Sequence, residues 1–554
     1  MSTSPNYPGA SSRKPHRIRL AFYRFATVLL AVGLGSGMAG AGVPGPEMLT
    51  PDLRVRTVVS GLDQPVSMAF LGPNDFLVVE KATGMVKRVV NGTVHSTVLN
   101  LEVNFASERG LLGIALHPFF PVDRGVYLYW SCTADPPPES NPFFPTAIEC
   151  PDQPELGAGD TDDVLAVPLL GNRVDRFIWN GTSLQFDRNL IKIRAFQHDG
   201  APTPPGQGDE EQPPRGNHDG GVLRFGPDGK LYVLIGDVGR RGQLQNLPSG
   251  PTETGLGPTA PDDQFGGPEP DDAHLTGVVL RLNDDGSTPA DNPFVGGGLF
   301  NRGPSIIGSG PLTSGGEVTD NIRRIFAYGV RNSFGMAFDP MSGNLWTQEH
   351  GDDSFDELNV VEPGFNSGWI QFMGPAERLF EFKAIETSME FFGLQQLRWP
   401  PTRLADSPVE AFQRLFRIPG SHYSDPEFSW RFAVAPGGIG FVNGRGLGPQ
   451  YEGDMFAGAS RTRLENGYLF HFNLTGNRRM IAADDPRLED RVADNFDKFD
   501  ITESEELLIG RNFGIGTDIQ TGPNGNLFVV SLSNGEVYEI SAARRNILGR
   551  PFKQ

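Results

Sequence analysis

Short runs of alternating apolar and polar residues recur along the chain, each broken by a turn rich in Pro, Gly, Asn or Asp. Six such copies lie at 68–80, 114–130, 223–237, 336–352, 441–459 and 519–531. Apolar residues at every second position on both sides of a turn are typical of a β-hairpin. Six hairpins spread along one chain predict an all-β, six-bladed β-propeller, in which the sheets surround a central channel. A β-sandwich or two smaller β-domains would show the same local pattern.

Insertions rich in Pro and Gly separate the hairpins, at about 133–161, 200–217, 248–272 and 296–319. They predict long loop insertions between strands. The stretch 376–417 is different, because its apolar residues lie three and four positions apart among good helix formers. This spacing predicts a partly helical excursion on one propeller face. The mostly charged segment 482–500 predicts a solvated loop.

The N-terminal residues have the pattern of an export signal. Basic residues between positions 13 and 24 precede the apolar run FATVLLAVGLGSGMAG, with small residues at Ala39 and Ala41. We therefore expect a secretory signal peptide at 1–41, followed by one propeller domain at 42–554. The run is too short and too rich in Gly to span a bilayer of roughly 30 Å comfortably, so we expect no membrane span after cleavage. An uncleaved anchor is the alternative.

Export would make a disulfide between the two cysteines possible. Cys132 and Cys150 are the only two in the chain and lie in one predicted insertion. In an oxidising compartment they can form a disulfide, but two free thiols would give the same sequence. The formal charge of −20, from 47 Lys and Arg against 67 Asp and Glu, disfavours binding to nucleic acid and to anionic lipid.

The segment EHGDDSFDELN (349–359) concentrates carboxylates. Asp352, Asp353, Asp356 and Glu357 fall within six positions. Carboxylates this close repel one another unless a positive charge lies among them. Calcium accepts oxygen ligands in flexible geometry, so we expect it to be the counter-ion, although the spacing is not that of an EF-hand. A solvated acidic loop is the alternative.

His218 is the first candidate for catalysis. It precedes Asp219 and two glycines at the start of a predicted strand. A histidine that titrates near neutrality can remove a proton from an alcohol or from water, and the glycines leave room for a ligand. A lone histidine is more often structural, and the same holds for His117, His274 and His350.

Arg331 and Asn332 lie together just before another predicted strand. Their donor and acceptor groups suit quinone or sugar oxygens, and they suit the capping of a neighbouring blade equally well. The chain has no Walker loop, HExxH, CxxC or GxSxG motif, so phosphoryl transfer, zinc proteolysis, thiol redox chemistry and the common serine hydrolase arrangement lack support.

Several of these segments occur in an order that resembles the glucose/sorbosone dehydrogenase family. They include ERGLLGIALHP, NHDGGVLRFGPDGKLYVLIGD, YGVRNSFGMAFDP, EHGDDSFDELNVVEPGFNSGW and SWRFAVAPGGIGF, and the resemblance runs from about residue 55 to 540. It implies a six-bladed propeller of the secreted or periplasmic type. The implied activity oxidises the anomeric hydroxyl of an aldose to a lactone with pyrroloquinoline quinone (PQQ) and calcium, and passes electrons to an unknown acceptor.

The resemblance also implies residue roles. His218 matches the family's general base, and Asn332, beside Arg331, matches an asparagine that contacts the quinone. Trp430 and Arg461 match residues near the cofactor. Gly351 and Asp352 match the loop whose backbone carbonyls bind calcium, and Asp356 with Glu357 match carboxylates of that loop. The chain also departs from the family pattern. Many members have His where this chain has Val330 and Gln where it has Phe334, and Ile515 and Thr517 stand where the glucose dehydrogenase branch has two arginines that hold the PQQ carboxylates.

Two other functions stay open at this point. The absent arginines and the large insertions fit a non-catalytic, calcium-stabilised propeller that binds a glycan or a protein. A calcium-dependent lactone hydrolase on a similar propeller would use water as its nucleophile and need no quinone.

Overall fold

The structure, a computed structural model, describes residues 44–136, 147, 149–196, 216–239, 275–295, 321–387, 404–415, 417–418, 420–460 and 466–543. The predicted signal peptide, His274, Arg461 and most of the predicted insertions lie outside these residues. None of the described helices is long and apolar enough to cross a membrane.

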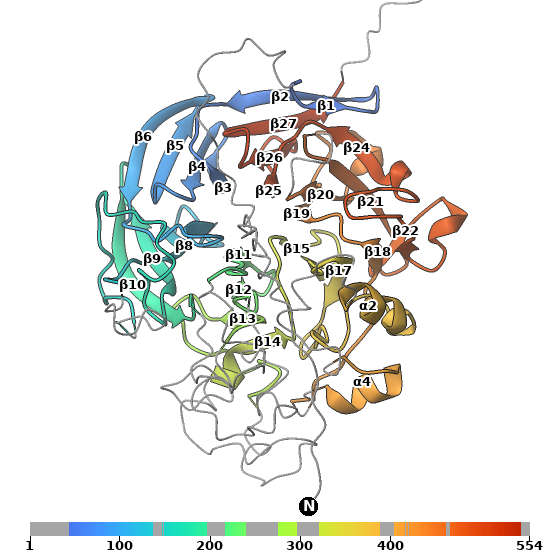
Figure 1. The fold of residues 1–554 in the computed structure, drawn as a ribbon. Coiled ribbons are helices and arrows are strands. Elements are labelled where there is room, and N and C mark those ends of the chain that lie inside the picture. The colour runs from blue at the N-terminus through green and yellow to red at the C-terminus, as the bar shows by residue number, and fades with distance from the viewer. Residues whose placement is uncertain are drawn as a thin grey trace, which may run out of the picture. The chain divides into compact units, whose positions relative to one another are not determined.

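Six sheets, each built around four strands, are arranged around a common axis (Figure 1), which confirms the predicted six-bladed propeller. Blade 1 contains β3 (Pro65–Gly72), β4 (Asp75–Glu80), β5 (Met85–Val90) and β6 (Thr93–Asn100). Blade 2 contains β7 (Leu111–Leu116), β8 (Gly125–Ser131), β9 (Asn172–Trp179) and β10 (Leu184–Ile193). Blade 3 contains β11 (Val222–Phe225), β12 (Leu231–Ile235), β13 (Val278–Leu282) and β14 (Ile325–Tyr328).

The other three blades carry additions to this plan. Blade 4 contains β15 (Met336–Phe338), β16 (Leu345–Glu349), β17 (Ser354–Val361) and β18 (Phe428–Phe432), extended by β23 (Val492–Ala493). Blade 5 contains β19 (Pro436–Phe441), β20 (Met455–Ala459), β21 (Leu469–Thr475) and β24 (Leu508–Arg511), extended by β1 (Glu47–Met48) and β22 (Met480–Ala482). Blade 6 contains β25 (Gly516–Thr521), β26 (Leu527–Ser531), β27 (Glu536–Ala542) and β2 (Leu53–Val59).

Each predicted hairpin forms the first two strands of one blade. The second strands β12, β16, β20 and β26 are buried at every position, because a neighbouring blade covers each face of their sheet. Burial of one Val, Leu or Ile side chain stabilises the fold by about 1.5–3 kcal/mol. The hydrophobic core is therefore divided among the spaces between blades, and any loop at the axis rests on a rigid scaffold.

The two ends of the described chain meet in blade 6. Strand β2 pairs antiparallel with β27, from Leu53 opposite Ala542 to Val59 opposite Val537. The first strands of neighbouring blades also contact one another around the axis. Where β19 passes β25 the backbones touch, since a Cβ atom at Gly437 would lie 2.1 Å from the carbonyl oxygen of Gly516. The glycines of PGGIGF therefore allow this close packing.

The predicted helical excursion contains η3 (Ala376–Arg378), α2 (Leu379–Glu386) and α4 (Pro408–Arg414). Helix α4 is capped by Ser407, whose hydroxyl accepts a hydrogen bond from the Glu410 backbone N–H at 3.2 Å, and Pro408 lies in its first turn. Helix α2 buries Leu379, Phe382 and Ile385. It thereby carries Glu386 to the acidic loop of blade 4.

Short 3₁₀ helices occur at η5 (Pro449–Tyr451), η6 (Pro486–Leu488) and η7 (Glu505–Leu507). Helix η6 lies within 482–500, the segment predicted to be a solvated loop. That segment also contains β23, which is buried and pairs in parallel with β18. Because the two buried residues of β23 are surrounded by charged residues, the sequence pattern does not predict this short strand.

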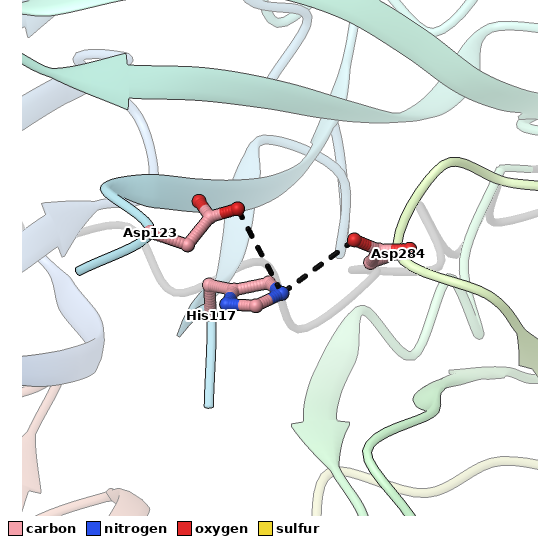
Figure 2. Close-up of side chains that lie close together, drawn as sticks. All are labelled: His117, Asp123 and Asp284. Carbon is pink, nitrogen blue, oxygen red and sulfur yellow. Dashed lines mark ion pairs between the residues drawn. The ribbon is translucent and has the colours of Figure 1, made fainter. Parts of the chain in front are cut away.

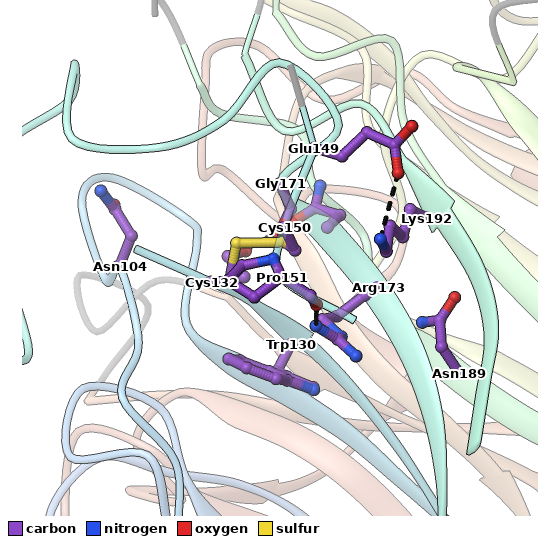
Figure 3. The surroundings of a disulfide bond; sticks show 12 residues. Asn104, Trp130, Cys132, Glu149, Cys150, Pro151, Gly171, Arg173, Asn189 and Lys192 are labelled. Carbon is purple, nitrogen blue, oxygen red and sulfur yellow. Dashed lines mark hydrogen bonds and ion pairs between the residues drawn. A yellow bond between two sulfur atoms is a disulfide. The ribbon is translucent and has the colours of Figure 1, made fainter. Parts of the chain in front are cut away.

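A disulfide joins Cys132, just after β8, to Cys150 (Figure 3). Both cysteines are buried, and their backbone N–H groups donate to the carbonyls of Gly171 and Leu170 respectively. The bond closes the loop between β8 and β9. Asn104 also holds this loop, because its side-chain amide donates to the carbonyls of Asp163 and Ala166.

We expect the double variant Cys132→Ser/Cys150→Ser to unfold at lower denaturant concentration than the wild type, with a loss of about 2–4 kcal/mol, because the unfolded chain gains freedom. Chemical denaturation followed by tryptophan fluorescence measures this loss. The chain has no other cysteine, so a reducing agent should lower the wild-type midpoint and leave that of the variant unchanged. Equal midpoints for the reduced and oxidised wild type would contradict the expectation.

Candidate active site

Four loops bring the predicted site residues to one end of the propeller. They are 216–221 before β11, 236–239 after β12, 329–335 between β14 and β15, and 350–353 after β16. In an antiparallel sheet the start of one strand lies beside the end of the next. The loop before each first strand and the loop after each second strand therefore share a face, which is the face that carries His218.

His218 is hydrogen-bonded to Asp237 across this face. The Nδ1 atom of His218 lies 2.5 Å from Oδ1 of Asp237, and both residues are buried. His218 has a left-handed backbone, with φ of 63°, and so do Gly220 and Gly221. A Cβ atom at Gly221 would lie 2.4 Å from Cβ of Leu112, so this glycine is needed for packing against blade 2.

Asp237 is held as a carboxylate by its neighbours. Its Oδ2 accepts a hydrogen bond from Trp369 Nε1 at 2.9 Å, and its Oδ1 accepts another from the Gly239 backbone N–H at 2.8 Å. Burial opposes ionisation, but the pair with His218, the nearby Arg331 and the Gly239 N–H outweigh it and hold the pKa of Asp237 below its usual value.

This arrangement selects the tautomer of His218. An ionised Asp237 accepts the proton on Nδ1, so the neutral ring leaves Nε2 unprotonated. Nε2 has no hydrogen-bond partner among the residues that the structure describes. A histidine with this orientation can take a proton at Nε2, and the carboxylate then stabilises the imidazolium.

Arg331 and Asn332 lie beside this pair. The guanidinium of Arg331 donates to the carbonyls of His350 and Gly351 at 3.0 and 3.1 Å. It also lies 5.4 Å from the centre of the Trp369 ring, close enough for a cation–π contact. Asn332 donates from Nδ2 to Glu108 at 3.2 Å, while its buried Oδ1 has no partner within the described part of the chain.

Glu108 connects the candidate base to Asn332. One oxygen, Oε2, accepts a hydrogen bond from the His218 backbone N–H at 2.7 Å and another from Asn332. Glu108 belongs to the segment ERGLLG just before β7, so this contact joins blade 2 to the loops of blades 3 and 4. The sequence pattern predicts no functional residue in this segment.

The acidic loop is balanced by two cations. Asp352 pairs with Arg331 at 2.8 Å, and Asp353 pairs with Lys498 at 2.5 Å. Glu386 from α2 approaches the same place and accepts the backbone N–H groups of Asp353 and Ser354. One oxygen from each of Asp352, Asp353 and Glu386 lies within 4.8 Å of the others. Burial and these two aspartates raise the pKa of Glu386 to about 8.

The group does not include Asp356 or Glu357. These two residues are neighbours on strand β17, so their side chains point to opposite faces of the sheet. Asp356 accepts backbone N–H groups from Gly351, Val434 and Ala435, and its burial nevertheless raises its pKa to about 6. Glu357 accepts from Gly374 and Asn359, and burial together with nearby Glu349 raises its pKa well above the usual value.

Of the predicted cofactor residues, Trp430 lies away from His218. It is fully buried on β18 among Phe428, Phe470 and Phe472, and its Nε1 donates to Ser504 at 3.0 Å. The tryptophan beside His218 is Trp369, which ends the segment EPGFNSGW. That segment is one of the motifs that carry the family resemblance. The sequence therefore contains both tryptophans in family motifs but does not indicate which of them lies beside His218.

A second cluster lies at the opposite end of the propeller. His117 Nε2 is 4.0 Å from Asp123 and 3.5 Å from Asp284 (Figure 2), a grouping that resembles a metal site. However, His117 Nδ1 accepts the Phe119 backbone N–H at 3.2 Å, so a neutral ring must carry its proton on Nε2. Metal ligation at Nε2 would move this proton to Nδ1 and end the hydrogen bond from Phe119. The cluster therefore serves better as a link between blades 2 and 3.

The sequence model of the glucose / sorbosone dehydrogenase family matches residues 62–141 and 208–377. These ranges include Glu108, His218, Asp237, Arg331 and Asp352. The resemblance indicated by the motifs is therefore confirmed. The match supports an oxidoreductase of the PQQ-dependent sugar dehydrogenase type.

Known proteins show the same likeness. The chain is 24% identical to the aldose sugar dehydrogenase YliI of Escherichia coli over 502 residues, which are 88% of this chain and 93% of that one. It is 29% identical to quinoprotein glucose dehydrogenase B of Acinetobacter calcoaceticus over 324 residues, 58% of this chain and 52% of that one. The apo crystal structure of soluble E. coli aldose sugar dehydrogenase matches with a TM-score of 0.53 at 21% identity, over 89% of this chain and all of that one, and shares the fold.

We expect stability to fall as pH rises from about 5 to about 8 in the presence of a chelator. Burial raises the pKa of Asp356 to about 6, of Glu349 to about 7 and of Glu386 to about 8. The unfolded chain releases these protons at lower pH than the folded protein does, so rising pH favours unfolding by on the order of a few kcal/mol.

Denaturation midpoints across this pH range measure the effect. Glu386→Gln should flatten the curve, because glutamine keeps an oxygen acceptor but does not ionise. Glu381→Gln, on the same helix but half-buried and paired with Arg378, is the matched control and should leave the curve unchanged. A midpoint that rises with pH would contradict the expectation.

Proposed function

We propose that the protein oxidises the anomeric hydroxyl of an aldose sugar to a lactone, with His218 as general base and with PQQ and calcium as cofactors. The His218–Asp237 pair carries this proposal, because it leaves a basic nitrogen at the propeller face. His218 Nε2 would accept the hydroxyl proton, and Asp237 would stabilise the charged ring. PQQ, when bound, supplies the chemistry of a two-electron hydride acceptor.

The residues beside His218 suit the quinone end of such a cofactor. Asn332 Oδ1 and Arg331 Nε are buried and have no hydrogen-bond partner among the described residues, so both can meet a polar ligand. Trp369 adds a flat apolar surface next to them. The carboxylate end is less well provided, since Ile515 and Thr517 carry no charge and Arg461 lies outside the described residues. We propose Arg461 for that end and Trp369 in place of Trp430 for the ring.

We propose that calcium binds at the loop 351–353. The backbone carbonyls of Gly351 and Asp352 would be ligands, while Asp356 would hold the loop through the Gly351 N–H and Glu357 would support the strand below. A buried oxygen of Asp353, Oδ2, has no hydrogen-bond partner in the described part of the chain. Because Arg331 and Lys498 already balance the loop, calcium must compete with them.

We further propose that residues 1–41 direct export and that the mature propeller, 42–554, is secreted or periplasmic. The Cys132–Cys150 disulfide supports this proposal, because such bonds persist mainly in oxidising compartments.

We expect His218→Ala to lower kcat for sugar oxidation by about 10²–10⁴-fold, because proton removal from the hydroxyl loses its base. The assay uses purified mature protein loaded with PQQ and calcium, a panel of aldoses and an artificial electron acceptor. The matched control is His471→Ala, which removes another histidine paired with an aspartate, Asp454 at 2.8 Å in blade 5. The control variant should keep wild-type activity.

The alternatives give different results in the same preparation. If a folded wild type neither takes up PQQ nor oxidises any aldose, the proposal is wrong and a binding role is favoured. Lactone turnover in quinone-free buffer would instead indicate a hydrolase. Stoichiometric PQQ binding with sugar oxidation that survives the loss of His218 would retain the activity and reject His218 as its base.

We expect Lys498→Met to tighten cation binding by about tenfold or more, because it removes a positive charge that competes for Asp353. Terbium luminescence, sensitised by a nearby tryptophan such as Trp369, measures the affinity, and calcium competition confirms the site. Asp353→Asn should weaken binding. Lys192→Met, which removes a lysine paired with Glu149 at 3.0 Å on blade 2, is the control. Equal affinity in the Lys498 and Lys192 variants would place the cation elsewhere.

A further inference from the structure

Asp219, the residue after His218, has no role in the chemistry proposed above. It is fully buried, and its Oδ1 accepts a hydrogen bond from Asn172 Nδ2 on β9 at 2.9 Å. Its backbone carbonyl accepts a second hydrogen bond, from the Tyr129 hydroxyl on β8 at 2.9 Å. Asp219 therefore fastens the His218 loop, which belongs to blade 3, to two strands of blade 2.

Arg109 holds the other end of the same loop. Its Nε donates to the carbonyl of Gly216 at 3.3 Å, and its Nη2 donates to Val164 at 2.9 Å. The contact is tight, since a Cβ atom at Gly216 would lie 2.4 Å from Nη2. Arg109 is fully buried as well, so the His218 loop is clamped on both sides by charged groups within the protein.

These contacts of Asp219 and Arg109 offset the free-energy cost of the left-handed backbone at His218. Left-handed backbone is uncommon for residues with a side chain, and His218 adopts it with φ of 63° between the anchored residues Gly216 and Asp219. Without those anchors an extended or right-handed backbone would be preferred, and the ring would leave Asp237. The contacts of Asp219 and Arg109 therefore bear on the geometry of the His218–Asp237 pair.

The charges around Asp219 are unusual for a purely structural anchor. Arg109, Lys81 and Glu108 are the charged groups that face it, and Tyr129 and Asn172 are its polar neighbours. One atom each of Asp219 and Arg109, Oδ2 and Nη1, has no hydrogen-bond partner among the described residues. Burial raises the pKa of Asp219 to about 7 and lowers that of Lys81 to about 8. Asp219 therefore gains and loses its proton near neutral pH.

We propose that Asp219 is a positioning residue for His218, whose buried carboxyl group anchors the left-handed turn to blade 2. The geometry of this clamp is independent of any cofactor. Its consequence for catalysis rests on the proposed function. Two separate measurements therefore test it.

The first measurement needs no sugar, quinone or calcium. The full mature chain is labelled with ¹³C-histidine, and the His218 ring signal is identified by its loss in His218→Gln. We expect Asp219→Ala to shift and broaden this signal at a fixed pH, because the loop loses the acceptor for Asn172 and the ring loses its fixed position against Asp237. Asp219→Asn keeps that acceptor and should leave the signal close to that of the wild type.

The matched control is Asp175→Asn. Asp175 is equally buried, lies on β9 and accepts from Trp130 and Arg173, but it does not touch the His218 loop. This variant should leave the His218 signal unchanged even where it lowers stability. The proposal is overturned if Asp219→Ala leaves the His218 signal as in the wild type, or if Asp175→Asn alters it as strongly.

The second measurement is kinetic. Under the proposed function, Asp219→Ala should lower kcat by about tenfold with KM nearly unchanged, because the residue acts through His218. Asp219→Asn, which keeps the acceptor for Asn172, should recover most of the loss. A change in KM alone would reject the positioning role. A wild type without any sugar oxidation would reject the proposed function, and the spectroscopic result would still decide the role of Asp219.

Discussion

The site depends on a carboxylate that stays ionised inside the protein. Burying the charge of Asp237 costs free energy, and the structure offsets that cost with hydrogen bonds from His218, Trp369 and the Gly239 backbone. These donors come from three different loops. The charge of Asp237 therefore orients His218, fixes the indole of Trp369 and draws three loops together. Removing it would leave donors from all three without their acceptor.

The other carboxylates at this face are accommodated in different ways, which explains how so acidic a region folds. Asp352 and Asp353 each have a cation, Arg331 and Lys498 respectively. Asp356 has three backbone N–H groups instead. Burial shifts the pKa values of Asp219 and Glu386 toward neutrality. Some carboxylates at this face are therefore held by fixed partners, while others change their protonation near neutral pH. The face thus has a rigid part and a pH-sensitive part.

Much of the fold could be predicted from sequence, because a hairpin is a local pattern. All six inner hairpins, the partly helical stretch and the position of His218 at a strand entrance follow from neighbours in the chain. Partners that are distant in sequence could not be found in this way. Lys498 and Glu386 reach the acidic loop from segments 145 and 32 positions away, and no spacing rule connects them to it.

Local spacing also misled in one respect. Four carboxylates within six positions suggested one cluster, but residues 354–361 form a strand, in which neighbours face opposite sides. Asp356 and Glu357 were thereby separated from each other, and Glu386 entered the group instead. The choice between Trp430 and Trp369 was similarly undecidable from sequence, because both lie in family motifs and only packing shows which of them approaches His218.

The proposed cofactors place a requirement on Arg331 that links the two halves of the site. In the structure this guanidinium is engaged by Asp352 and by the carbonyls of His350 and Gly351. A calcium ion bound to the Gly351 carbonyl would compete with Arg331 for that oxygen. Arg331 would then have a donor available for a quinone oxygen at the end of the site where Asn332 lies. Under the proposed function, cation binding and quinone binding are therefore coupled through one side chain, because the cation changes the partner of Arg331 without changing the charge on that side chain.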